Sequence, residues 1–234
     1  YKRQACEALE LGSVDMAVVD MAQLIRMEKN DENLPYGVVI SGVLKRGDSR
    51  YVMIRKRHAK DLIENAVVAT DSYSKTERIK HMYDGISCVV ETDIRKCIEK
   101  LDASECDAVF VLLEDIKAAR LHNSFLYRYT IMDYGECVPV HGEGVYAMLT
   151  KGKKEAVRTA RELSHKSTAE CFEIEDDIIS RVMQNVYVKT WDVYARISSD
   201  RLEIYADVTG NRGRIRVNAV SYTHLRAHET VLDL

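Results

Sequence analysis

The chain has 234 residues, of which 46% are hydrophobic and 30% are charged, and its formal net charge is -3. This composition is typical of a globular protein, with enough apolar residues for one large domain or several small ones. The charge balance gives no basic field of the kind that nucleic-acid binding requires, so we expect no nucleic-acid partner. No apolar run reaches the roughly 18–20 residues of a membrane-spanning helix, and no signal peptide opens the chain, so we expect no membrane association.

The amino-terminal half alternates between predicted helices and strands. Residues 2–11 have a helical pattern that ends at Gly12. Apolar strands are expected at 15–21, 37–44 and 51–54. From 66 to 113 strands and helices alternate closely, and the strands are apolar without polar alternation, as expected where both faces are buried. This order predicts βαβ units on a parallel or mixed sheet, and therefore an α/β fold.

The carboxy-terminal part has a different pattern. A helix is predicted over 168–183, where apolar residues recur near helical spacing. From residue 186 onward apolar and polar residues alternate, which predicts three antiparallel strands with one face exposed to solvent. The change of pattern near residue 165 predicts a domain boundary.

The final segment, 221–234 (SYTHLRAHETVLDL), does not continue this alternation. It resembles the conceptual translation of a sequencing-library adapter, and the chain begins with Tyr1 inside a predicted helix. We therefore expect a chain truncated at both ends, with a non-native tail over 221–234 that packs against nothing. A native polar tail is the alternative.

The six cysteines are spread along the chain without a CxxC pair: Cys6, Cys88, Cys97, Cys106, Cys137 and Cys171. A zinc site needs closely spaced ligands, and the histidines show no metal-ligand spacing either, so we expect no metal. Several cysteines lie inside apolar runs, where a small buried thiol is the usual interpretation. A reducing, cytoplasmic location is therefore expected.

Four segments follow one another in an order that is typical of a known family. Residues 7–24 (EALELGSVDMAVVDMAQL) contain a helix that ends at glycine, then Asp-hydrophobic-Ala-Val and a loop. The other segments are 67–72 (VVATDS), 98–109 (IEKLDASECDAV) and 139–144 (PVHGEG). Together they resemble the hydroxymethylbilane synthase (porphobilinogen deaminase) family, which has Val-Gly-Thr-Ser-Ser-Leu-Arg-Arg at the second segment and Pro-Ala-Val-Gly-Gln-Gly at the last. The ordered set is more specific than any single segment.

The resemblance implies an α/β fold with two lobes like those of periplasmic binding proteins, built from mixed sheets with helices, and the start of a small α+β third domain. On this basis we expect 1–55 to be the C-terminal part of domain 1 and 56–132 to be domain 2. We expect 133–164 to return to domain 1 and 165–220 to be part of domain 3.

The resemblance also implies a transferase of tetrapyrrole and heme biosynthesis, which joins porphobilinogen units onto a dipyrromethane primer held by a cysteine. This chemistry needs a carboxylate to stabilise positive charge on the pyrrole nitrogens. The family's carboxylate falls on Gln23 and its lysine on Ala22, while Asp20, on a segment predicted to be extended, is expected to face the opposite side. The family's cysteine falls on Val186. No cysteine follows Cys171, so we expect no covalent dipyrromethane cofactor in this chain.

The residues that bind substrate carboxylates in the family are also changed. Its two arginines, which suit bidentate binding, fall on Ser74 and Lys75. Thr70 and Ser72 are retained at the start of a predicted helix, whose free N–H groups can hold an anion. We therefore predict that the remaining substrate site consists of Thr70, Ser72, Lys75 and Arg78, and that it binds a small anionic, pyrrole-type ligand at most. N-capping is the alternative role of Thr70 and Ser72.

The combined loss of carboxylate, arginines and thiol favours a divergent family member without the family's activity. Two alternatives remain open. One is a transferase that uses other residues, and the other is a non-catalytic scaffold or interaction protein on the same fold. We expect a monomer.

Overall fold

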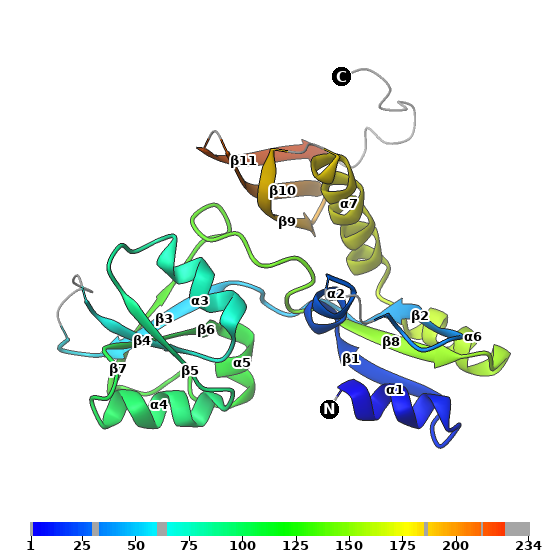
Figure 1. The fold of residues 1–234 in the computed structure, drawn as a ribbon, viewed down its shortest axis with the longest axis horizontal. Helices are drawn as coiled ribbons and strands as arrows, with labels where there is room; N and C mark the ends of the chain where they lie inside the picture. Colours follow the sequence, from blue (N-terminus) through cyan, green and yellow to red (C-terminus); the bar gives the residue numbers. More distant parts are fainter. Residues whose placement is uncertain (1, 30–32, 60–64, 185–186, 212, 223–234) are drawn as a thin grey trace. The chain divides into compact units, whose positions relative to one another are not determined.

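The computed structural model describes residues 2–29, 33–59, 65–184, 187–211 and 213–222 (Figure 1). By its internal contacts the chain divides into two compact units: Tyr1–Gly47 with Val140–Leu234, and Asp48–Pro139. The first unit is therefore built from two separate stretches of sequence. The predicted division into three domains stays a prediction. Most of the predicted non-native tail, 223–234, lies outside the described residues, but Ser221 and Tyr222 pair with Leu202 and Arg201 in a sheet, so for these two residues the expectation of no packing is wrong. Within the described ranges, no helix is both long and apolar enough to cross a membrane.

The second unit contains a mixed five-stranded sheet in the order β5-β4-β6-β3-β7. Strand β4 (Val67–Thr70) pairs in parallel with β5 (Ser87–Val90) and β6 (Ala108–Leu112). Strand β3 (Tyr51–Lys56), which was predicted to end domain 1, pairs antiparallel with β6 and with β7 (Tyr127–Ile131). The α/β class with a mixed sheet, predicted from the alternation of strands and helices, is confirmed.

Helices cover both faces of this sheet (Figure 1). They are α3 (Tyr73–Lys80), α4 (Ile94–Asp102) and α5 (Leu113–Ala118). Successive side chains of β6 point to opposite faces, so Phe110 packs in the cluster that contains Ile79 of α3, whereas Val109 packs in the cluster that contains Leu101 of α4. All four side chains are almost fully buried, and each such burial contributes about 1.5–3 kcal/mol to stability.

The first unit contains an antiparallel sheet in the order β1-β8-β2. Its strands are β1 (Met16–Asp20), β2 (Val38–Val43) and β8 (Tyr146–Lys151). The central strand, β8, comes from the second stretch of sequence and pairs with both neighbours, so the sheet is complete only after the chain has returned. The helices of this part are α1 (Lys2–Glu10), α2 (Met21–Lys29) and α6 (Lys154–Leu163).

The same unit contains a second antiparallel sheet, β11-β10-β9, with α7 (Lys166–Met183) packed against β9 (Figure 1). The strands are β9 (Val188–Ser198), β10 (Arg201–Gly210) and β11 (Gly213–Tyr222). Val193 and Ala195 of β9 are fully buried, whereas the next residue, Arg196, is partly exposed and pairs with Glu203 of β10. The three antiparallel strands predicted from alternation are confirmed.

Candidate functional site

The family's carboxylate position lies in the first turn of α2, which begins directly after β1. Asp20 is the last residue of β1, and its Oδ1 accepts a hydrogen bond from the backbone N–H of Gln23 at 2.9 Å. Asp20 therefore caps α2, and Asp-x-x-Gln is a capping pattern. The expectation that Asp20 and Gln23 lie on an extended segment and face opposite sides is wrong, because a capped helix brings them one turn apart.

The predicted substrate residues Thr70 and Ser72 flank the start of α3. Thr70 ends β4 and is fully buried, and its Oγ1 has no hydrogen-bond partner among the described residues. Ser72 has the extended backbone of an N-cap residue, but its side chain makes no capping hydrogen bond. Its Oγ instead lies 3.1 Å from the Oγ of Ser74. The structure therefore does not support the alternative role of Ser72, in which its hydroxyl caps the helix.

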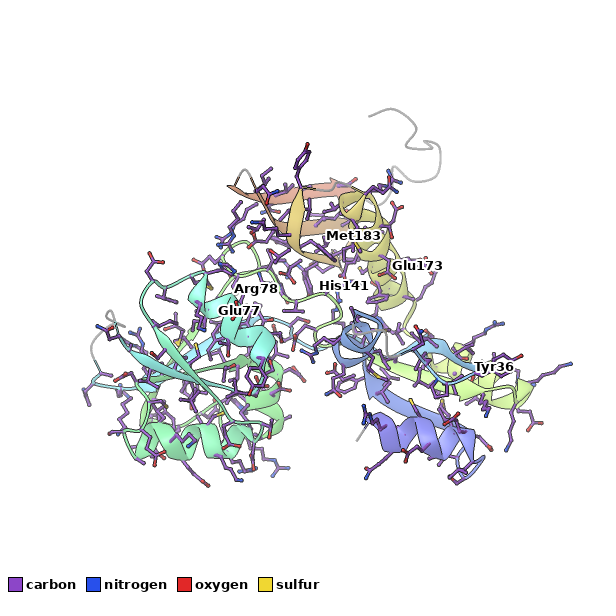
Figure 2. All side chains as sticks on the ribbon, in the orientation of Figure 1. Tyr36, Glu77, Arg78, His141, Glu173 and Met183 are labelled. Atoms are coloured by element: carbon purple, nitrogen blue, oxygen red, sulfur yellow. The ribbon has the colours of Figure 1, made fainter. Side chains whose placement is uncertain are left out.

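The two predicted cations, Lys75 and Arg78, lie on α3 itself, where Figure 2 labels Arg78 beside Glu77. Lys75 is only 3% exposed, and its Nζ donates a hydrogen bond to Oδ2 of Asp71 at 2.7 Å. Arg78 is 7% exposed. The structure thus places Thr70, Ser72 and Lys75 near the start of α3, but Arg78 lies in its last turn. Both cations are buried, and Lys75 pairs with the carboxylate of Asp71.

A second polar cluster, in the first unit, was not found from the sequence. The Nη1 and Nη2 atoms of Arg46 donate to the two carboxylate oxygens of Glu175 at 2.5 and 2.9 Å. Glu175 is fully buried on α7, and its Oε1 also accepts from the N–H of Ala195 at 2.7 Å. The Arg46 guanidinium lies over the ring of Tyr194, with 4.7 Å between its Cζ and the ring centroid. These contacts hold α7 against β9 and the loop after β2.

His141 completes this cluster, and Figure 2 shows it beside α7. Its Nε2 lies 2.9 Å from Asp176 Oδ1, its Nδ1 lies 3.3 Å from Glu175 Oε2, and its ring stacks on Phe172 at 4.8 Å between centroids. Burial alone lowers the pKa of His141, but hydrogen bonds and charges from Asp176 and Glu175 outweigh it, so the pKa is raised above its ordinary value. The cluster therefore favours an imidazolium.

This raised pKa predicts how stability depends on pH. A group whose pKa is higher in the folded state contributes stability that is fully present below its unfolded pKa, about 6.5, and lost as pH rises through its folded pKa. We expect the stability difference between the wild type and a His141→Asn variant to shrink as pH rises from 5.5 to about 8.5. Urea denaturation at several pH values measures this difference. A difference that stays constant across the range would contradict the assigned ion pairs.

Most of the thiols of the chain are buried. All six cysteines are free, five are buried, and only Cys88 is partly exposed. Burial is the largest cause that raises the pKa of Cys171 to about 11 and that of Cys97 to about 12. Because the thiolate is the nucleophile, these groups are poor sites for covalent attachment near neutral pH. Val186, the family's cysteine position, lies outside the described residues. The described residues include no cluster of three or more His, Cys, Asp or Glu side chains that could hold a metal.

Comparison with solved structures finds several distant similarities. One is an ABC transporter protein from Parabacteroides distasonis, with a TM-score of 0.48 and 13% identity, covering 78% of this chain and 64% of that one. Another is the periplasmic aliphatic sulphonate binding protein SsuA from Escherichia coli, with a TM-score of 0.45 and 16% identity, covering 77% and 61%.

The family model "Porphobilinogen deaminase, dipyromethane cofactor binding domain" matches residues 1–159. The chain therefore belongs to the porphobilinogen deaminase family, which confirms the resemblance seen in the sequence. It is 22% identical to porphobilinogen deaminase from Clostridium acetobutylicum, over 87% of this chain and 74% of the relative. It is 24% identical to the enzyme from Chlorobium luteolum, over 78% and 58%. The chain thus spans only 58% of the length of the second relative.

Proposed function

We propose that the chain is a porphobilinogen deaminase family protein without the family's polymerisation activity, which at most binds a small anionic, pyrrole-type ligand weakly at α3. The observation that carries this proposal is the helical cap at α2. Gln23 occupies the position of the catalytic carboxylate, and the carboxylate of Asp20 is held by the backbone N–H of Gln23. A neutral amide supplies no negative charge to stabilise a cationic pyrrole intermediate, and such charge is the largest part of electrostatic catalysis.

The state of the cations at α3 supports the same proposal. One of the family's arginine positions is Ser74, and the other is Lys75, whose ammonium is already paired with Asp71. A hydrogen bond between charged groups contributes about 1.5–3 kcal/mol. Replacement of two bidentate arginines therefore predicts a loss of several powers of ten in affinity for a chain of pyrroles that carries many carboxylates.

The thiols support the absence of a covalent dipyrromethane cofactor. The residues of this chain do not fit attachment of that group, because the cysteine nearest in sequence to the family's position, Cys171, is 4% exposed inside α7 and its pKa is raised to about 11. No cysteine occurs after it. Without a thioether-linked primer, the family's reaction has no starting point in this chain.

A direct activity assay tests the proposal. The purified chain, incubated with porphobilinogen, is expected to form no hydroxymethylbilane, so the porphobilinogen that Ehrlich's reagent detects should not be consumed. The porphobilinogen deaminase of Clostridium acetobutylicum, prepared in the same way, serves as the positive control. Product formed by the chain itself at a rate that scales with its concentration would show that other residues support catalysis, and the proposal would be wrong.

The same proposal includes a monomer in the cytoplasm, without a nucleic-acid partner. The six cysteines, which form no disulfide, support a reducing compartment.

A scaffold or interaction protein is the second candidate function. The buried Lys75–Asp71 pair favours it, because the charge of Lys75 is already paired within the protein and is less available to a ligand. Titration with an anionic ligand distinguishes the two, since a scaffold shows no binding at any accessible concentration.

A further inference from the structure

The environment of Lys75 contains more acceptors than the fold uses. Asp71 precedes the N-cap residue of α3 and pairs with Lys75 through Oδ2 at 2.7 Å, one helical turn away. The other carboxylate oxygen, Oδ1, has no hydrogen-bond partner among the described residues, and the same holds for the hydroxyl of Thr70. Buried polar atoms are normally satisfied by hydrogen bonds, so two such oxygens at the start of the helix that carries Lys75 are unusual for a packed core and suggest a place for a ligand.

The exposure of the two partners shows which of them closes the site. The side chain of Lys75 is 3% exposed, whereas that of Asp71 is 18% exposed. The carboxylate side chain therefore lies nearer to solvent than the ammonium with which it pairs. A buried ammonium without an anion is strongly unfavourable, so Asp71 provides the compensation that a ligand carboxylate would otherwise provide. It also lies at the amino-terminal end of α3, where the helix dipole favours a negative charge.

We infer that Asp71 is a built-in competitor for ligand carboxylates, which occupies the anion position of Lys75 and so determines how weakly the α3 site binds anions. The inference rests on the proposed function, because it concerns the same weak anion site. An intramolecular group competes at an effective concentration of at least about 1 mM, so removal of the carboxylate is expected to strengthen anion binding markedly. The resemblance to the family places a serine at position 71, and Asp71→Ser is therefore the natural substitution.

Calorimetric titration with citrate, a simple polycarboxylate, tests this inference. We expect Asp71→Ser to bind citrate at least about ten-fold more tightly than the wild type at low salt, and the gain to weaken as salt screens the ion pair. The double variant Asp71→Ser/Lys75→Ala should lose the gain, because the ammonium is the group that the substitution uncovers. Asp84→Ser, which removes one exposed carboxylate elsewhere in the same unit, is the matched control and should show no gain.

The loss of Asp71 also removes the partner of a buried charge, so folding is measured in parallel. Asp71→Asn keeps the size of the side chain, and citrate should raise the melting temperature of either Asp71 variant more than that of the wild type. A folded Asp71→Ser protein without tighter binding, or a gain that persists without Lys75, would overturn the inference. Submillimolar binding of citrate by the wild type, if Lys75→Ala abolishes it, would also overturn the inference. This last measurement does not require either Asp71 variant to fold. None of these results depends on the activity assay, so failure here is distinct from failure of the proposed function.

Discussion

Replacement of Glu175 by alanine is expected to lower the free energy of unfolding by about 3–5 kcal/mol, because it leaves the buried guanidinium of Arg46 without its carboxylate. The Arg46 side chain is 8% exposed, and both Nη atoms donate to Glu175. The substitution also removes the acceptor of the Ala195 N–H in β9. Urea unfolding followed by the fluorescence of Trp191, the only tryptophan of the chain, measures the loss in the part that contains the pair.

Two further variants separate the buried pair from a general effect on α7. Glu173→Ala removes an exposed carboxylate from the same helix and should leave the unfolding transition unchanged. The double variant Arg46→Met/Glu175→Leu replaces both charges with apolar groups and should recover most of the loss, since a buried pair contributes little net stability over a well-packed apolar pair. An equal effect of Glu173→Ala and Glu175→Ala would contradict the central role assigned to the Arg46–Glu175 pair.

The sequence predicted those elements whose burial leaves a local pattern. All five residues of β6 are buried, and the uninterrupted apolar run Ala108–Leu112 follows directly from burial of both faces. The sheet with α7 against it was predictable for a related reason, since aliphatic residues recur at every second position along parts of β9 and β10, as a face packed against a helix requires. In each case the position of a residue within a strand determines whether its side chain is buried.

The helix α2 was not predicted, although its signal is present in the sequence. Asp20 and Gln23 have the spacing of a capping box, but the preceding apolar strand and the resemblance to a catalytic loop favoured an extended interpretation. Glu175 gave a similar signal, because it lies between Cys171 and Ile179 on the buried side of α7. A carboxylate in that row predicts a buried partner, but Arg46 lies 129 residues away and no local pattern identifies it.

The helix α3 that carries Lys75 and Arg78 was predicted from the sequence, but the state of these cations was not predictable. The spacing of four between Asp71 and Lys75 allows an ion pair on any helix, and exposed pairs of this kind are weak. Burial gives this pair its importance, and burial depends on packing of α3 against the sheet. The sequence therefore predicted a positive group available to a ligand, where the structure has a cation that is already neutralised.

The mass of the intact protein tests the central claim of the account most directly. The chain is expressed in a host that makes porphobilinogen, purified, and measured by mass spectrometry, with the Clostridium acetobutylicum relative as a control for the supply of cofactor. We expect the unmodified mass, because the six thiols are buried or partly buried and Cys171 keeps its proton near neutral pH. An added mass equal to one dipyrromethane, mapped to any cysteine of this chain, would contradict the account.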